Sequence, residues 1–577
     1  MKHHLLSLIL ILLCLNAQSQ LQKGELKMGE DMSFEIKPGG MHQVIVSLEQ
    51  NQFVYIKLLQ KGIDVQIDVK DPSGNKVGYF DSPNGTSGPE PIAFSTTSSG
   101  KYMLEISPFN EDGPSGTYDL NVISIQPKAI ENGDQVDQLF TIWDSKVSPG
   151  AAVSVIQDGK IIYKNGYGMA NLEYDISVEP SSVFHIASIS KQFTAFSILL
   201  LESEGKLSLE DEIQKYIPEV PDFGKKITLR HLASHTSGMR DQWSLLQMAG
   251  WRMDDVITKE QVLKLVANQK ELNFDPGEEY YYSNTGFTLL AEVVARVSGR
   301  TFAEFTQERI FEPLNMSNTL FYDDHEKIVK NRAYSYRGLG EGFRKANLNY
   351  ANVGATSLFT TVEDLSLWSM NFWNMTVGNE EIFKKLNTPH KLNNGEEFEG
   401  ALGQFVVKYK GMDEIQHGGA DAGYRAYITR FPEENFAVIV FSNDGNFNPV
   451  NMAHGIVDIY LKDKLKQEKL PPRPPIPPTD TKEKSFDPST VDLNEFQGEF
   501  YSEELQTTYK FKVVDGALMA SHPRHPDFQL RPRIEDEFTP TAGFFGLTRY
   551  VRDDSNTITG IRVSNGRVRN LYFEKVK

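Results

Sequence analysis

A proline-rich segment near the C-terminus divides this 577-residue chain into separate folding units. Residues 470–480 read LPPRPPIPPTD, with six prolines in the eight residues 471–478. Proline lacks a backbone N–H and fixes φ, so neither a helix interior nor a central strand continues through such a run. We therefore expect an extended polyproline-II linker over residues 466–489, with an independent unit on each side.

The first 20 residues, MKHHLLSLILILLCLNAQSQ, have the layout of an export signal. Lys2 precedes an apolar run at residues 5–15, which is shorter than a bilayer-spanning helix, and residues 17–19 form a small-x-small cleavage site. We expect residues 1–19 to be removed and the mature protein to be periplasmic or secreted. An uncleaved anchor and lipidation at Cys14 are the alternatives. Cys14 is the single cysteine, so cleavage excludes disulfides, thiolate metal sites and a cysteine nucleophile.

Two regions of short alternating strands flank a larger region of mixed pattern. Residues 20–126 predict a β-sandwich accessory domain, and residues 490–577 predict a small antiparallel β-barrel. Between them, residues 130–465 carry strand patterns near both ends, at 151–164 and 424–442, and apolar helical patterns in the middle. This order predicts a mixed α/β domain in which both ends contribute strands to one sheet.

Charge and residue content narrow the function classes. The chain holds 59 Lys and Arg against 77 Asp and Glu, a net charge of −18, and we expect no nucleic-acid partner. His231 and His235 have a spacing that can bind zinc, but no glutamate lies between them in the metalloprotease pattern, so we expect no metal and no cofactor. The flanking β domains are candidates for contact with cell wall or carbohydrate, and the oligomeric state stays open.

The spacing Ser-x-x-Lys occurs four times, at residues 73–76, 98–101, 188–191 and 203–206. The first two lie in expected turns, and the last straddles an expected helix end. Only Ser188 opens a long apolar helix, on which positions i and i+3 share a face and Lys191 lies above Ser188. A helix N-terminus also favours an oxyanion. Ser188 is therefore the candidate nucleophile; a plain helix N-cap is the alternative.

Two more motifs offer partners, which are needed because a serine hydroxyl and a lysine ammonium are both poorly poised at neutral pH. Tyr-x-Asn occurs three times, and only Tyr282-x-Asn284 joins a proline-glycine turn to an apolar helix. His-x-Gly occurs once, as His417-x-Gly419, beside an expected strand where glycines let a substrate approach the backbone. The nucleophile elbow G-x-S-x-G is absent from the sequence, which argues against an α/β-hydrolase.

The ordered motifs Ser188-x-x-Lys191, Tyr282-x-Asn284 and His417-x-Gly419 resemble those of a serine hydrolase family. This family includes class C β-lactamases, D-alanyl-D-alanine carboxypeptidases, D-aminopeptidases and β-lactamase-like esterases. The stretches GKLSLEDEIQKYIPEVP (205–221), ITLRHLASHTSGM (227–239), FDPGEEYYYSNTGF (274–287) and GATSLFTTVEDLSLW (354–368) agree with it. The resemblance covers residues 130–465 and implies a β-lactamase/transpeptidase-like fold, an antiparallel sheet flanked by helices with a helical subdomain. The C-terminal segment resembles the small β-barrel often appended to such hydrolases.

The resemblance also implies roles for the motif residues. Ser188 is the acylated nucleophile, Lys191 helps to remove its proton, and Tyr282 passes a proton to the leaving group. Asn284 hydrogen-bonds the substrate or holds Lys191.

The third motif is implied to line the substrate site. The oxyanion hole uses the backbone N–H groups of Ser188 and Ala420, with Gly418 and Gly419 beside the substrate. His417 stands where β-lactamases usually carry the lysine of Lys-Thr-Gly. Because histidine is mostly neutral at pH 7, this departure weakens a β-lactamase function without excluding it.

We therefore expect an exported serine hydrolase that acts through a Ser188 acyl-enzyme. It would cleave an amide, peptide or ester bond in a small peptide, a cell-wall fragment or an acyl ester. The alternatives are a β-lactamase and a catalytically silent, penicillin-binding-like sensor or binding protein.

Overall fold

The computed structural model describes residues 22–576, apart from residues 83, 111, 341 and 467–485. The predicted export signal and most of the predicted proline-rich linker therefore lie outside the described residues. Within the described part of the chain, no helix is both long and apolar enough to cross a membrane.

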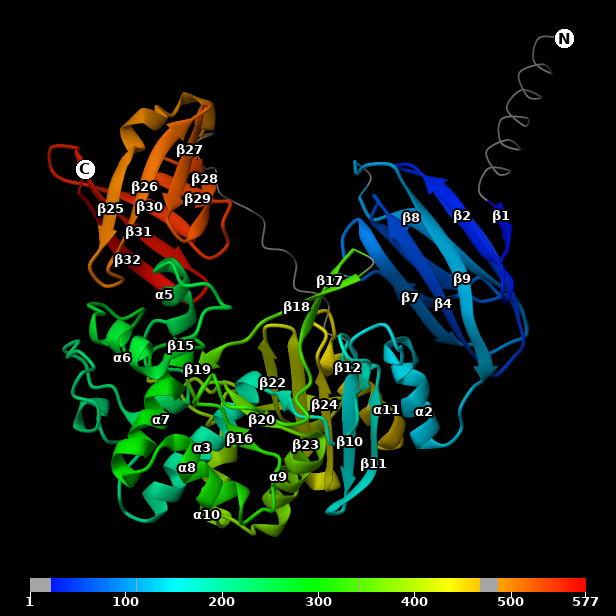
Figure 1. The fold of residues 1–577 in the computed structure, drawn as a ribbon, viewed down its shortest axis with the longest axis horizontal. Helices are drawn as coiled ribbons and strands as arrows, with labels where there is room; N and C mark the ends of the chain where they lie inside the picture. Colours follow the sequence, from blue (N-terminus) through cyan, green and yellow to red (C-terminus); the bar gives the residue numbers. More distant parts are fainter. Residues whose placement is uncertain (1–21, 83, 111, 341, 467–485, 577) are drawn as a thin grey trace.

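Two sheets form the N-terminal region (Figure 1). One has the order β1-β3-β8-β5-β6 and the other the order β2-β9-β4-β7. The strands are β1 (Gln22–Glu25), β2 (Asp31–Ile36), β3 (His42–Leu48), β4 (Gln52–Lys61), β5 (Val65–Lys70), β6 (Lys76–Phe80), β7 (Ser87–Ser95), β8 (Gly100–Pro108) and β9 (Gly116–Pro127). Every second residue of β3 and β5 is buried in one core shared by both sheets, as the alternating sequence predicts.

The central sheet has six antiparallel strands in the order β11-β10-β24-β23-β22-β21. They are β10 (Ala151–Gln157), β11 (Lys160–Tyr167), β21 (Phe405–Tyr409), β22 (Met412–Asp421), β23 (Tyr424–Phe431) and β24 (Phe436–Ser442). β10 pairs directly with β24, so strands near the two ends of the central region meet in one sheet, as predicted. This pairing places β22, which carries the His417 motif, near the edge of the sheet.

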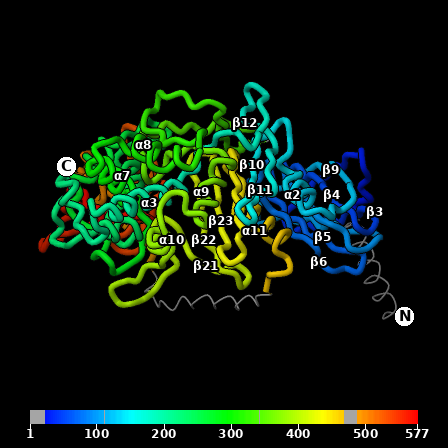
Figure 2. The backbone as a smooth tube through the Cα atoms, turned by 90° about the horizontal axis from the view of Figure 1, so that it is seen from below, coloured from blue at the N-terminus to red at the C-terminus, as the bar shows by residue number. Residues whose placement is uncertain are grey.

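Helices cover both faces of this sheet (Figure 2). Alternate residues of β24 enter two cores: Phe436, Val438 and Val440 pack with α2 (Asn132–Phe140) and α11 (Pro449–Tyr460). The intervening residues face α3 (Ser190–Ser203) and α9 (Val362–Asn374). The other helices are α4 (Leu229–Ala233), α5 (Gln242–Met248), α6 (Lys259–Ala267), α7 (Asn284–Ser298), α8 (Phe302–Thr306) and α10 (Glu380–Asn387).

Short strands connect these layers. They are β12 (Met169–Asn171), β13 (Ile176–Ser177), β14 (Phe184–His185), β15 (Ile257–Thr258), β16 (Leu320–Phe321), β17 (Tyr336–Leu339), β18 (Gly342–Lys345), β19 (Tyr350–Ala351) and β20 (Leu358–Thr360). The β17-β18 hairpin extends toward the N-terminal sheets, where the carbonyl of Gly340 lies beside Gly88 (Figure 1). The hairpin thus connects the central domain to the N-terminal sheets.

The C-terminal region is a closed antiparallel barrel of eight strands. They are β25 (Gly498–Ser502), β26 (Thr507–Val514), β27 (Ala517–His522), β28 (His525–Ile534), β29 (Glu537–Pro540), β30 (Leu547–Arg552), β31 (Ile558–Asn565) and β32 (Val568–Lys575). Two prolines and two arginines hide the alternation of β28 in the sequence. Buried aromatic side chains such as Tyr509, Phe511 and Phe573 fill the interior.

The barrel is docked on the helical part of the central domain, next to α5 (Figure 1). Its core and the central core form one continuous buried cluster, and the Tyr509 hydroxyl donates a hydrogen bond to the Met248 carbonyl at 2.9 Å. The proline-rich stretch therefore separates the two units in sequence but not in packing.

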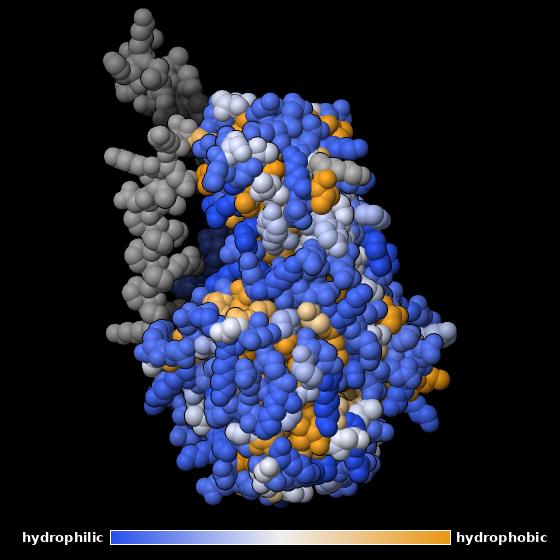
Figure 3. Space-filling view, turned by 90° about the vertical axis from the view of Figure 1, so that its left-hand side faces the viewer, coloured by the Kyte–Doolittle hydropathy of each residue, from blue (hydrophilic) through white to orange (hydrophobic). Residues whose placement is uncertain are grey.

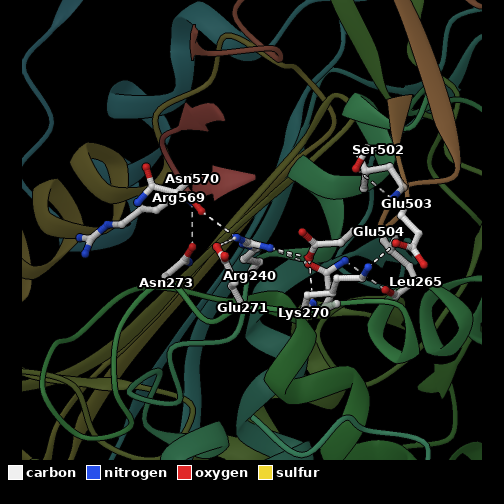
Figure 4. A network of polar contacts seen from close by, with 12 residues as sticks. Arg240, Leu265, Lys270, Glu271, Asn273, Ser502, Glu503, Glu504, Arg569 and Asn570 are labelled. Carbon is white, nitrogen blue, oxygen red and sulfur yellow. Dashed lines mark hydrogen bonds and ion pairs between the residues drawn. The ribbon is translucent and has the colours of Figure 1, made fainter. Parts of the chain in front are cut away.

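Charged residues reinforce this interface (Figure 4). The buried Arg240 guanidinium pairs with the buried Glu504 carboxylate at 2.6 Å and donates to the Arg569 carbonyl at 3.0 Å. Arg569 in turn forms a two-pronged ion pair with Glu279, at 2.9 and 3.0 Å. Removing one member of such a buried pair leaves the other charge unpaired, which makes the docking geometry specific.

The face drawn in Figure 3 is mostly hydrophilic, as the net charge of −18 leads one to expect.

Candidate active site

Ser188 lies in a sharp turn at the start of α3. A single 3-10 turn, Ala187–Ile189, precedes the helix, which begins at Ser190, so Ser188 stands just before the helix rather than as its first residue. Ala187 adopts φ +47°, which is costly for a residue with a Cβ and marks a strained position. Ser188 is partly exposed, whereas both neighbouring residues are buried. The turn therefore presents one hydroxyl to the outside of an otherwise closed core.

Lys191 meets Ser188 one helical turn further along, as the i, i+3 spacing predicts. Its Nζ lies 3.0 Å from the Ser188 Oγ, 2.8 Å from the Asn284 Oδ1 and 2.7 Å from the Ala355 carbonyl oxygen. The side chain is fully buried. Burial lowers the pKa of Lys191 to about 7, although Asp421 and Asp241 oppose the shift.

These contacts assign the proton positions of a neutral Lys191. The Asn284 Oδ1 and the Ala355 carbonyl can only accept, so they take the two N–H groups of the amine. The remaining lone pair then faces the Ser188 hydroxyl. Because burial lowers the pKa to about 7, the neutral form is well populated at neutral pH. Neutral Lys191 can therefore remove the Ser188 proton by itself, without a metal ion or another base.

Asp241 orients this base and was missed by the sequence motifs. Its Oδ2 accepts from the backbone N–H of Asn284 at 2.7 Å and from the Asn284 side-chain amide at 2.8 Å. This fixes the amide so that its oxygen points to Lys191. The Asp241 Oδ1 caps α5 by accepting from the N–H groups of Trp243 and Ser244. In sequence, Asp241 carries only the signal of a helix N-cap.

Tyr282 lies on the same side of Ser188 as Lys191. The Lys191 Nζ is 5.0 Å from the centre of its ring, and the buried His235 ring stacks on it at 4.1 Å. Burial raises the pKa of Tyr282 well above its usual range, although a hydrogen bond with Ser188 lowers it. Tyr282 is therefore protonated at neutral pH and can donate to a leaving group.

His417 completes the cluster as a neutral group. Its ring lies 6.4 Å from that of Tyr282, and burial lowers its pKa to about 3, aided by the nearby Lys191 charge. The Nδ1–H donates to the Gly418 carbonyl at 2.6 Å. Among the described residues, Nε2 is buried and has no hydrogen-bond partner, so it is an unsatisfied acceptor next to the cluster.

The glycines of the third motif let β22 approach the nucleophile. A Cβ on Gly419 would lie 2.2 Å from the Ile186 carbonyl oxygen, so only glycine fits against the Ser188 turn. Gly418 has no such restriction, since its nearest neighbour would be 3.7 Å away. Ala420 is exposed near the end of β22. The predicted oxyanion donors at Ser188 and Ala420 thus lie on two elements in direct contact.

Asp421 and His185 form a second set of buried polar residues next to the site. Asp421 accepts a hydrogen bond from the Thr356 hydroxyl, and burial raises its pKa to about 6. His185 is fully buried, and its pKa is lowered to about 3, so its ring is neutral and has one acceptor nitrogen. Its Nδ1 lies 3.2 Å from the backbone nitrogen of Ala187, and its Nε2 lies 3.2 Å from that of Ser357. These contacts connect the strained turn to the loop that carries the Ala355 carbonyl.

The structure therefore brings Ser188, Lys191, Tyr282, Asn284 and His417 into one cluster, while their catalytic roles stay predictions. His231 lies elsewhere, in the capping box of α4 with Thr228. The other Ser-x-x-Lys serines are outside the cluster; Ser203, for example, donates to the Leu200 carbonyl at the end of α3. No cluster of metal-ligand residues occurs among the described residues.

The fold and the site together define a serine hydrolase of the β-lactamase type. In this site a partly exposed serine contacts a buried lysine, and a tyrosine and the strand with the histidine-glycine motif lie beside them. The family model "Beta-lactamase" matches residues 136–459, more than half of the sequence. The chain belongs to this family, and the predicted resemblance is confirmed.

Several known proteins share this region. The D-aminopeptidase of Gluconobacter oxydans (strain 621H) is 28% identical over 296 residues, which cover 51% of this chain and 56% of that protein. Penicillin-binding protein 4* of Bacillus subtilis (strain 168) is 27% identical over 320 residues, 53% of this chain and 70% of that protein. The chain thus spans little more than half the length of the D-aminopeptidase.

A solved structure shares the fold. The octameric penicillin-binding protein homologue from Pyrococcus abyssi superposes with a TM-score of 0.52 at 22% identity, covering 77% of this chain and 99% of that one. The predicted fold class is confirmed: a β-lactamase-like central domain with N-terminal sheets and a closed C-terminal barrel.

Proposed function

We propose that the protein is an exported serine hydrolase that cleaves an amide, peptide or ester bond through an acyl-enzyme on Ser188. The observation that carries this proposal is the contact of the Ser188 hydroxyl with Lys191, a fully buried amine whose pKa is lowered to about 7. Desolvation penalises the charged form of such a lysine, so the charge of Lys191 does not stabilise the fold. Its geometry suits a general base.

The reaction proceeds from these contacts in two steps. Neutral Lys191 takes the Ser188 proton while the oxygen attacks the substrate carbonyl, and backbone N–H groups of Ser188 and Ala420 hold the oxyanion. Tyr282 donates its proton to the leaving nitrogen or oxygen, which releases the first product. Water then attacks the Ser188 ester and gives a proton to the Tyr282 phenolate, while the Lys191 ammonium returns its proton to the Ser188 oxygen as the ester bond breaks; this releases the acid product and restores the free hydroxyl.

Amide substrates are favoured within this class. The matched relatives include proteins named D-aminopeptidase and penicillin-binding protein 4*, and we carry over from them only the class of small peptide and amide substrates. Hydrolysis of esters and of β-lactams is measured in parallel with amide hydrolysis. A silent sensor is disfavoured because the base, its orienting amide and the acid are all present and in contact.

The test is covalent labelling with an uncharged fluorophosphonate, read by intact mass. We expect one label per chain in the wild type and none in Ser188→Ala. Ser203→Ala is the matched control, since Ser203 also begins a Ser-x-x-Lys sequence but bonds only to the end of its own helix. Equal labelling of all three proteins would overturn the assignment.

Export, and contact of the flanking β domains with cell wall or carbohydrate, belong to the same proposal. Support for export comes from residues 1–19 of the sequence. N-terminal sequencing of the protein recovered from cell fractions tests it: export predicts a mature chain beginning at Gln20 outside the cytoplasm. Co-sedimentation with isolated cell wall tests the contact.

A further inference from the structure

A hairpin of the C-terminal barrel reaches the catalytic cluster. The tight turn between β31 and β32 holds Arg567, and Asn565 caps this turn by accepting the backbone N–H of Arg567 at 3.0 Å. The Arg567 carbonyl accepts from the backbone N–H of Asp241 at 3.3 Å and from the Asn273 amide at 3.2 Å. The barrel therefore delivers one arginine to a fixed place beside the residues that orient Lys191.

The Arg567 guanidinium lies over the ring of Tyr282, the predicted proton donor of the cluster. Its central carbon lies 4.9 Å from the centre of the Tyr282 ring, and its charge lowers the pKa of both Tyr282 and Lys191. Its field therefore reaches the reacting groups.

The donors of this guanidinium are free among the described residues. The carboxylate nearest to it is Asp241, at 3.9 Å, which is beyond hydrogen-bond distance. Asp241 is also already occupied, since its oxygens accept from Asn284 and from the start of α5. The Arg567 side chain is 44% exposed, so a ligand can reach it.

The remaining cationic candidates in the site are poor anion binders. His417 is neutral, with its pKa lowered to about 3, and the Lys191 ammonium points to Ser188, Asn284 and Ala355. An arginine stays charged and offers a planar pair of N–H groups that matches a carboxylate. Arg425, whose charge also acts on Asp421, uses its guanidinium to donate to the carbonyls of Ala422 and Tyr424. The arginine with unused donors beside Tyr282 therefore comes from the barrel, not from the histidine-glycine motif.

We propose that Arg567 binds a free carboxylate of the substrate, so that the barrel completes the substrate site and selects peptides or acyl amino acids that end in a carboxylate. This inference rests on the proposed function for its reaction, and on the placement of Arg567 for its specificity. A substrate with an ammonium near the scissile bond is repelled by the same guanidinium.

The test compares two substrates that differ only in charge: N-acetyl-D-alanyl-D-alanine and its C-terminal amide. The readout is the ratio of their kcat/KM values, which cancels any shared effect on Lys191. We expect Arg567→Gln to lower the acid-to-amide ratio about 10- to 100-fold, the range of a charge-assisted hydrogen bond. Arg567→Lys should give an intermediate ratio. The control is Arg531→Gln, which removes the same charge from an exposed barrel position whose side chain donates to the Gln529 side chain.

A binding measurement separates this inference from the proposed function. Calorimetric titration of Ser188→Ala with N-acetyl-D-alanine and with its amide requires no turnover. We expect the acid to bind more tightly, and the difference to vanish in Ser188→Ala/Arg567→Gln. Equal binding of acid and amide, or an acid-to-amide ratio that Arg567→Gln leaves unchanged, would overturn the carboxylate site. Failure of fluorophosphonate labelling would overturn only the acyl-enzyme proposal.

Discussion

The lowered pKa of Lys191 predicts the pH dependence of Ser188 acylation. Only neutral Lys191 can take the serine proton, and the pKa of about 7 makes its neutral fraction rise about tenfold between about pH 6 and pH 8, then level off. A lysine at its ordinary pKa would give a rise of about 100-fold over the same interval with no plateau. Asp421, whose pKa is raised to about 6, titrates at the lower end of this interval, whereas burial holds the pKa values of the three histidines of the site far below it.

Timed fluorophosphonate labelling at a series of pH values, quantified by intact mass, measures this profile. Two variants shift its midpoint in opposite directions. Asp421→Asn removes the charge that most raises the pKa of Lys191, so the midpoint falls; Arg567→Gln removes a charge that lowers it, so the midpoint rises. A rate that is flat from about pH 6 to pH 9, or one that keeps climbing without a plateau, would refute Lys191 as a buried neutral base.

Two catalytic residues and one interface give further predictions. Lys191→Met and Tyr282→Phe should each remove most of the kcat, about 10²–10⁴-fold, and the double variant should be little worse than the worse single one, because the two act as one proton-transfer unit; losses that multiply would argue for separate steps. Arg240→Met should destabilise the protein by about 3–5 kcal/mol in chemical unfolding, since it leaves Glu504 buried and unpaired. Lys270→Gln, which breaks an exposed ion pair with Glu503 across the same interface, should cost less than about 1 kcal/mol; equal losses would contradict the buried pair.

The motif residues were predictable because they lie on or next to regular elements. Lys191 follows Ser188 by about one helical turn, so the two meet although Ser188 stands in the turn before α3, and the continuous apolar run of β24 follows from burial on both faces. The positive φ of Ala187 was not predictable, since it arises where the close approach of β22 at Gly419 fixes the turn.

Residues that act across domains left no signal in the sequence. Asp241 shows only an N-cap pattern, and its bond to Asn284 depends on how α5 packs against α7. Arg567 is one arginine in a hairpin more than 270 residues from Tyr282 in sequence, and only the docking of the barrel through Arg240 and Glu504 brings them together. The local sequence pattern determines the helices and strands, whereas tertiary packing determines which distant residues come into contact.

Capture of the acyl-enzyme from a substrate tests the central claim most directly. The protein is mixed with a panel of esters, D-amino-acid peptides and β-lactams, quenched in acid within its turnover time, and analysed by intact mass and peptide mapping. We expect a mass gain equal to the acyl group, located on the peptide that contains Ser188 and absent from Ser188→Ala. Substrate turnover with no acyl group on Ser188, or with the same mass gain in Ser188→Ala, would contradict it.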